Sequence, residues 1–168
     1  MSSGDRSVTA QFVATFFDPE EVGPDEAADE HGFLADRSQA DWKKIIEHTE
    51  TRRFVRDEVL VTAGDTDRSL ILLTEGTIGV RLAGDETRTF KTIVAPSVVG
   101  EVAFLDGGPR SATLFAITAG ELLRLRMEAF EVLSAHDPEL GRAVLFDLAR
   151  IVTRRLRLAS DVIAGSGS

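Results

Sequence analysis

A Gly-Glu pair and an Arg nine positions after the Glu are the residues of this chain best suited to binding chemistry. They stand in the segment Val99–Thr113, which reads VGEVAFLDGGPRSAT. Gly100 allows close backbone approach, and the apolar run after it can open a short helix whose free N–H groups and dipole attract an anion. Glu101 could accept hydrogen bonds from a sugar hydroxyl, whereas Arg110 offers a planar fork of donors for phosphate oxygens, with the Ser111 hydroxyl beside it. The segment therefore predicts a pocket for a phosphorylated sugar.

These residues resemble the phosphate-binding cassette of the cyclic nucleotide-binding domain, found in bacterial catabolite activator proteins and in regulatory subunits of cyclic-nucleotide-dependent kinases. The chain departs from the family cassette only at Phe104, where Leu is usual. The resemblance implies that Glu101 binds the ribose 2′-hydroxyl, Arg110 the exocyclic phosphate oxygens and Ser111 a phosphate oxygen. Amides near Gly100 would bind the sugar-phosphate ring. The cassette positions expected to bind ligand are Gly100, Glu101, Val102, Ala103, Arg110, Ser111 and Ala112.

A second resemblance lies near the C-terminus, in the segment RRLRLAS that ends at Ser160. It aligns with the activator helix where that helix meets the nucleotide base. Arg155 matches an Arg that pairs with the cassette Glu, and Ser160 matches a Ser that reaches the adenine of the partner subunit. Ala159 stands where the activator has Thr. The resemblance therefore adds Arg155 and Ser160 to the expected ligand-binding residues.

The expected ligand is cyclic AMP, because Ser111 matches the bacterial activator, whereas kinases selective for cyclic GMP usually carry Thr there. Phosphate and ribose contacts carry no information about the base, so cyclic GMP and the pyrimidine cyclic nucleotides stay open. No other cofactor is expected.

Composition limits the remaining functions. A chain of 168 residues with 43% hydrophobic residues has room for one domain with a real core. The net charge of -9 disfavours direct binding to nucleic acid or anionic lipid. There is no Cys, no apolar run near eighteen residues and no secretory signal, which favours a cytoplasmic protein without membrane attachment. The three histidines are dispersed, and no catalytic motif is present, so neither a metal site nor an enzyme is expected.

The pattern of capping residues, apolar runs and Gly turns along the chain predicts the elements that must position the cassette. Ser38 followed by Asp41 is typical of a capping box that opens a helix through His48, with Trp42 in the core. Short β-branched and apolar runs separated by Gly turns then predict six strands. Their ranges are Val59–Val61, Leu70–Thr74, Thr77–Leu82, Thr87–Ile93, Thr113–Ile117 and Glu121–Arg126. We expect an α+β protein: an antiparallel β-roll of the jelly-roll type (a double-stranded β-helix), with an N-terminal helix, a short cassette helix and a long C-terminal helix.

The C-terminal helix is expected from Pro138 to about Ile163, after a short helix over Met127–Ser134. Its apolar residues recur every three or four positions. The resulting apolar stripe is long for burial against one small β-roll. In the activator family the corresponding helix pairs with its mate in a parallel dimer, so a homodimer is expected here. The expected division is an N-terminal segment with an acidic flexible arm (1–32), a cyclic nucleotide-binding domain (33–163) and a tail (164–168).

The function hypothesis is a stand-alone, non-enzymatic sensor in which ligand binding moves the helices after the roll and alters the surface offered to an unknown effector protein. In this hypothesis the buried Glu101 and Arg110 find their hydrogen-bond partners only in the bridging ribose and phosphate. Two alternatives stay open. One is an interaction or scaffold module with a vestigial pocket, and the other is a regulatory domain of a larger effector.

Overall fold

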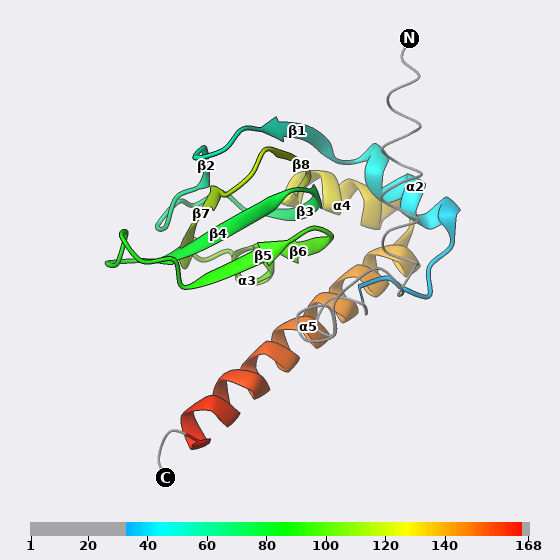
Figure 1. Cartoon of the computed structure of the whole chain (residues 1–168). Coiled ribbons are helices and arrows are strands. Elements are labelled where there is room, and N and C mark those ends of the chain that lie inside the picture. Colours follow the sequence, from blue (N-terminus) through cyan, green and yellow to red (C-terminus); the bar gives the residue numbers. More distant parts are fainter. Residues whose placement is uncertain (1–32, 166–168) are drawn as a thin grey trace.

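Two four-stranded antiparallel sheets face each other in the computed structural model, which describes residues 33–165 and the side chains of residues 33–157 (Figure 1). The first sheet has the order β1-β8-β3-β6 and the second the order β2-β7-β4-β5. The strands are β1 (Glu50–Phe54), β2 (Val59–Val61), β3 (Ser69–Glu75), β4 (Thr77–Leu82), β5 (Lys91–Val94), β6 (Ser97–Val99), β7 (Ala112–Ala116) and β8 (Gly120–Arg126). The helices are α2 (Gln39–Glu47), α3 (Glu101–Asp106), α4 (Met127–His136) and α5 (Pro138–Gly165).

Strand β3 is the centre of the core because both of its faces are covered. Leu70 and Leu72 face the helices, where they pack in one apolar cluster with residues of α2, α4 and α5. Ile71 and Leu73 alternate with them and belong to a second cluster between the two sheets. A continuous apolar run is what a strand buried on both faces requires. On the face toward the other sheet, β3 begins with the buried Ser69 instead of an apolar residue. This end of the roll is therefore polar.

The helices close the outer face of the first sheet. Ser38 is the N-cap of α2, and its hydroxyl accepts a hydrogen bond from the amide of Asp41 at 3.1 Å. Trp42 is fully buried and meets Phe33 edge-to-face. The long helix α5 begins at Pro138 and runs diagonally away from the roll (Figure 1). One face of it lies in the core through Leu140, Val144, Leu148 and Ile151, whereas other members of the same stripe, Leu145 and Leu156, are exposed.

The structure confirms the predicted fold class, the capped α2 and the start of α5. Two strands were missed. Strand β1 reads ETRRF and pairs only with β8 at the sheet edge, where charged side chains leave no apolar signal. Strand β6 has only three residues. The prediction for β5 was also wrong at its start: the strand begins at Lys91 rather than Thr87, because pairing with Val80 ends there and residues 83–90 form the exposed hairpin loop. The division into three segments stays a prediction.

Candidate functional site

The short helix α3 begins at Gly100, which has φ +81°, in the left-handed region that favours glycine. A Cβ at this position would also overlap the guanidinium of Arg110. The first hydrogen bond of the helix runs from the Phe104 amide to the Gly100 carbonyl at 3.1 Å. The amides of residues 101–103 therefore have no acceptor within the helix, and together with the helix dipole they favour an anion at this end.

Arg110 is buried, with 5% of its surface exposed. Its Nη2 donates to the Asp67 carboxylate at 2.9 Å, to the Ser69 carbonyl at 2.7 Å and to the Ser69 hydroxyl at 3.1 Å. Its Nη1 donates to the Gly100 carbonyl at 3.2 Å. Its Nε is buried and makes no hydrogen bond with the described part of the chain. These hydrogen bonds fix the side chain, and one buried donor, Nε, is left without a partner among the described residues.

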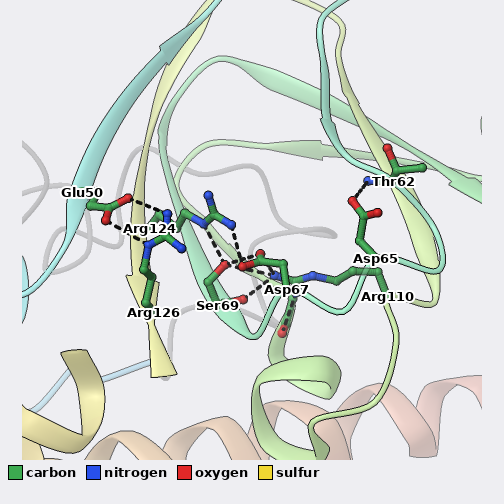
Figure 2. Close-up of polar contacts among 9 residues, drawn as sticks. Glu50, Thr62, Asp65, Asp67, Ser69, Arg110, Arg124 and Arg126 are labelled. Carbon is green, nitrogen blue, oxygen red and sulfur yellow. Dashed lines mark hydrogen bonds and ion pairs between the residues drawn. The ribbon is translucent and has the colours of Figure 1, made fainter. Parts of the chain in front are cut away.

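Asp67 is the centre of the network behind Arg110 (Figure 2). One carboxylate oxygen pairs with Arg110, and the other lies 2.6 Å from Nη2 of Arg124. The Ser69 hydroxyl donates to Asp67 at 2.7 Å and accepts from Nε of Arg124 at 3.0 Å. Burial opposes ionisation of this carboxyl, but hydrogen bonds from Ser69, Arg110 and Arg124 outweigh it and lower its pKa to about 2. Asp67 is therefore an anion under all ordinary conditions and fixes two arginines.

Glu101, with 7% of its surface exposed, forms an ion pair with Nη1 of Arg155 on α5. Nη2 of the same arginine donates to the carbonyl of Val98 at 3.1 Å. The cassette carboxylate is consequently linked to the long helix, and this is the pair that the sequence resemblance implied.

A pocket of about 250 Å³ lies between α3, the second sheet and α5, and it brings most of the predicted site residues together. It is lined by Gly100, Glu101, Val102, Ala103, Arg110, Ser111, Ala112 and Arg155. Ser111 is exposed at this pocket, and its hydroxyl has no hydrogen-bond partner among the described residues. Ser160 belongs to the helical segment of α5, but its side chain lies outside the described residues.

Sequence reasoning missed the other walls of the pocket and the network behind it. The walls consist of Val61, Val80, Leu82, Phe90, Lys91, Ile93, Val99 and Leu114, most of them on one face of the second sheet. Alternation along the strands was the available signal, but it indicates a shared face only once the pairing is known. Nothing in the neighbouring sequence indicated that Asp67 and Ser69 belong to the site.

One expectation about the cassette was wrong. Glu101 and Arg110 were expected to be satisfied only by a bound ligand, whereas the structure gives each of them protein partners. The reason is tertiary: the β2–β3 loop lies against the cassette, and α5 lies across its other side. The protein itself therefore supplies partners for both charges.

The histidines within the described residues have local roles. Nδ1 of His48 lies 2.6 Å from the Lys44 carbonyl, and Nδ1 of His136 lies 2.8 Å from the Val132 carbonyl, both at helix ends. His31 lies outside the described residues. The part of the chain that the structure describes contains no group of three His, Cys, Asp or Glu side chains able to hold a metal ion. In the same part, none of the helices is both long and apolar enough to cross a membrane.

Comparison with known proteins agrees with this geometry. A family model described as the cyclic nucleotide-binding domain matches residues 51–137, and the chain belongs to this family. A CRP-like cAMP-activated global transcriptional regulator from Mycobacterium tuberculosis is 27% identical over 113 residues, which are 66% of this chain and 49% of that protein. The crystal structure of the catabolite activator protein of Thermus thermophilus matches with a TM-score of 0.70 and 25% identity, covering 79% of this chain and 62% of that one.

The chain spans about half the length of the Mycobacterium relative. A protein named glutaminase 2 from Bradyrhizobium diazoefficiens is also similar, 28% identical over 132 residues, but these are 78% of this chain and only 20% of that protein. The domain described here thus resembles parts of longer proteins with different names. The shared feature is the cyclic nucleotide-binding domain, so the comparisons identify the fold and the class of regulatory domain.

Proposed function

We propose that this chain is a cyclic nucleotide sensor without catalytic activity, that cyclic AMP is its ligand, and that ligand binding is signalled to an effector protein through α5. The observation that carries the proposal is that Arg110, whose buried Nε has no partner among the described residues, lines one pocket with Glu101 and the start of α3. Buried donors without partners are costly, and an anion at this place would satisfy them. The name of the Mycobacterium relative supports cyclic AMP and a regulatory role, and the name of the Thermus protein, an activator, supports a regulatory role.

In this proposal each cassette residue has a separate task. Glu101 accepts a hydrogen bond from the ribose 2′-hydroxyl, Arg110 donates to the exocyclic phosphate oxygens, and Ser111 donates to a phosphate oxygen from the pocket rim. The amides of Glu101 and Val102 bind the remaining phosphate charge. The apolar strand walls cover the base, and the contact of Glu101 with Arg155 passes the arrival of the ribose to α5.

Titration calorimetry of the purified protein tests the proposal. The ligands are cyclic AMP, cyclic GMP, cyclic CMP and cyclic UMP, with 5′-AMP as the open-phosphate control. We expect binding in the micromolar range or tighter for cyclic AMP, and weak or no binding for 5′-AMP. Absence of heat and of thermal stabilisation with every ligand would contradict the sensor and favour an interaction module with a vestigial pocket.

One observation favours a second candidate, a regulatory domain within a larger effector. The Mycobacterium relative, named as a transcriptional regulator, is about twice as long as the segment it shares with this chain. The binding chemistry is the same in both candidates, so calorimetry does not separate them. Affinity capture from the source organism by the ligand-loaded protein separates the two candidates, because only a separate sensor needs a partner encoded elsewhere.

A further inference from the structure

The described chain begins alongside the long helix α5. Arg37 forms an ion pair with Glu139 in the first turn of α5, with 3.5 Å between Nη1 and the carboxylate. Three residues earlier in the chain, the amide of Leu34 donates to the buried carboxylate of Asp147 at 2.7 Å. Figure 1 shows this part of the chain, in blue, beside α5. Followed backward in sequence, the chain therefore runs along α5 toward the C-terminal end of the helix.

Arginines follow Asp147 on the same side of α5. Arg150, Arg154 and Arg157 lie three, seven and ten positions after it, and an α-helix repeats every 3.6 residues, so these side chains share one face. All three are exposed. They are termed the arginine face. The direction in which the chain is heading at Leu34 leads to this face.

Apolar packing holds only the first half of α5. Among the residues whose side chains are described, Ile151 is the last buried one of this helix. Beyond it, Arg155 attaches the helix to the cassette through Glu101 and the carbonyl of Val98. The arginine face adds concentrated positive charge to this outer part, in a chain whose net charge is -9. An acidic partner would offset the repulsion among these arginines and give the outer part of α5 a second attachment.

The chain itself carries such a partner. Residues 18–30 lie outside the described residues, and their sequence contains seven acids and no Lys or Arg. Glu30 is only four positions before Leu34, whose amide hydrogen bond fixes the chain beside Asp147. From Asp147 to Arg157 the helix rises about 15 Å, a distance that an extended chain covers in about five residues. The acidic segment is therefore long enough to follow the entire arginine face.

We propose that the acidic segment 18–30 binds the arginine face of α5 within the same chain. Carboxylates and guanidiniums form charge-assisted hydrogen bonds, and several pairs in a network stabilise more than an isolated surface pair does. Leu145 and Leu156 lie on a different face of α5, so this contact leaves them uncovered. The proposal goes beyond the proposed function and does not depend on it, because the contact needs no nucleotide.

Paramagnetic relaxation in NMR spectra tests the contact. The chain contains no cysteine, so a Glu26→Cys variant takes a single nitroxide label in the acidic segment. We expect the label to broaden the amide signals of residues 150–157 more than those of α2. Helix α2 is the reference because Phe33 also contacts its Trp42, so tethering alone would broaden both helices alike. Salt at about 1 M should abolish the difference, because the Debye length then falls to about 3 Å.

Charge-removing variants in the labelled chain separate the arginine face from the rest of the surface. Arg154→Gln combined with Arg157→Gln should lose most of the extra broadening in α5. Arg56→Gln combined with Arg88→Gln removes two exposed charges elsewhere and should keep it. All four side chains are exposed, and unchanged signals from β3 show that each variant is folded. The salt titration needs no variant of α5 and gives an independent result.

Three outcomes would overturn the proposal. The first is equal broadening of α2 and of residues 150–157, and the second is extra broadening that neither salt nor the arginine variant reduces. The third is equally strong broadening in a mixture where label and isotope are on different chains, which would assign the contact to a second copy. Failure of the proposed function leaves these spectra unchanged, because they are recorded without nucleotide.

Discussion

At the scale of single residues, the main point is that Arg110 serves the fold and the site at once. It joins the cassette to Asp67 of the β2–β3 loop and to Ser69 of β3, and its buried Nε has no partner among the described residues. A guanidinium can do both because its five donors point in fixed directions. The ammonium of a lysine has no such fork, so charge alone cannot replace Arg110.

The first prediction concerns this side chain. Arg110→Ala should weaken cyclic nucleotide binding by roughly ten- to a hundred-fold, because the ligand loses a charged hydrogen-bond partner. Since Asp67 also loses a partner, Arg110→Lys is the informative companion: it retains the positive charge but not the fork, and we expect it to be more stable than the Ala variant and still weak in binding. Calorimetry gives the affinities, and Arg56→Ala, at an exposed arginine, is the control. Wild-type affinity in a folded Arg110→Lys variant would show that binding does not need the fork of the guanidinium.

The second prediction concerns pH and Asp67. The folded-state pKa of this carboxyl, about 2, lies below its usual value of 3.8. Its contribution to stability is therefore fully present above about pH 4 and is lost as the pH falls from about 4 toward 2. In Asp67→Asn we expect lower stability at neutral pH and a flatter pH dependence within this window, measured by urea unfolding at several pH values. The exposed Asp36→Asn is the control. Parallel pH curves for the wild type and Asp67→Asn would contradict the assignment.

At the scale of elements, the β2–β3 loop is the part that aligns the cassette. Asp67 holds Arg110, while the neighbouring Arg68 donates from Nε to the carbonyl of Phe104 at 2.9 Å and from Nη2 to that of Leu105 at 3.0 Å. These are carbonyls at the end of α3, where a cation also complements the helix dipole. Two adjacent residues thus secure the last turn of the cassette helix and the arginine after it. The Arg68 carbonyl in turn accepts from the Met127 amide at the start of α4 at 3.0 Å.

The third prediction tests the link between α3 and α5. Because Arg155 is the ion-pair partner of Glu101, we expect cyclic nucleotide binding to slow amide hydrogen exchange in both α3 and α5 of the wild type. In Arg155→Met the slowing should persist at the cassette and largely disappear in α5. Hydrogen exchange with and without cyclic AMP measures it, and Arg157→Met, two residues further along the same helix, is the control. Undiminished protection of α5 in Arg155→Met would show that the signal does not pass through this pair.

At the scale of the whole molecule, α5 has more apolar surface than the roll covers. Leu145, Ala149 and Val152 follow one another at intervals of four and three along one face, and Leu145 is 40% exposed. This spacing is typical of helices that pair along their length. It supports the proposal that two copies of the chain associate through α5, as the sequence pattern predicts.

The fourth prediction follows from that stripe. Light scattering should give the wild type a mass of twice 18.2 kDa at micromolar concentrations. Leu145→Glu should shift it toward the mass of one chain, because a charge in the stripe is desolvated on association. Val132→Glu, which adds the same charge at an exposed apolar position on α4, should remain dimeric. A wild type with the mass of one chain at every concentration would exclude the homodimer.

What the sequence by itself determined was local. The types and spacing of Gly100, Glu101 and Arg110 indicated the pocket chemistry, the apolar run of β3 indicated a buried strand, and Ser38 and Pro138 marked helix starts. Each of these signals is complete within a few neighbouring residues, because helix capping and the φ of a glycine depend on local geometry, and an apolar run is contained within one strand. They were sufficient for the family and the fold.

Only the tertiary structure decided which distant residues complete the site. Asp67 is 43 positions from Arg110, its partner in the network behind the cassette. Lys91 reaches the pocket because β4 pairs with both β5 and β7, and a shift of one residue in this pairing would turn its side chain to the opposite face. Such contacts depend on strand register and loop closure, which are set by the packing of the entire core and leave no trace in the spacing of the residues concerned.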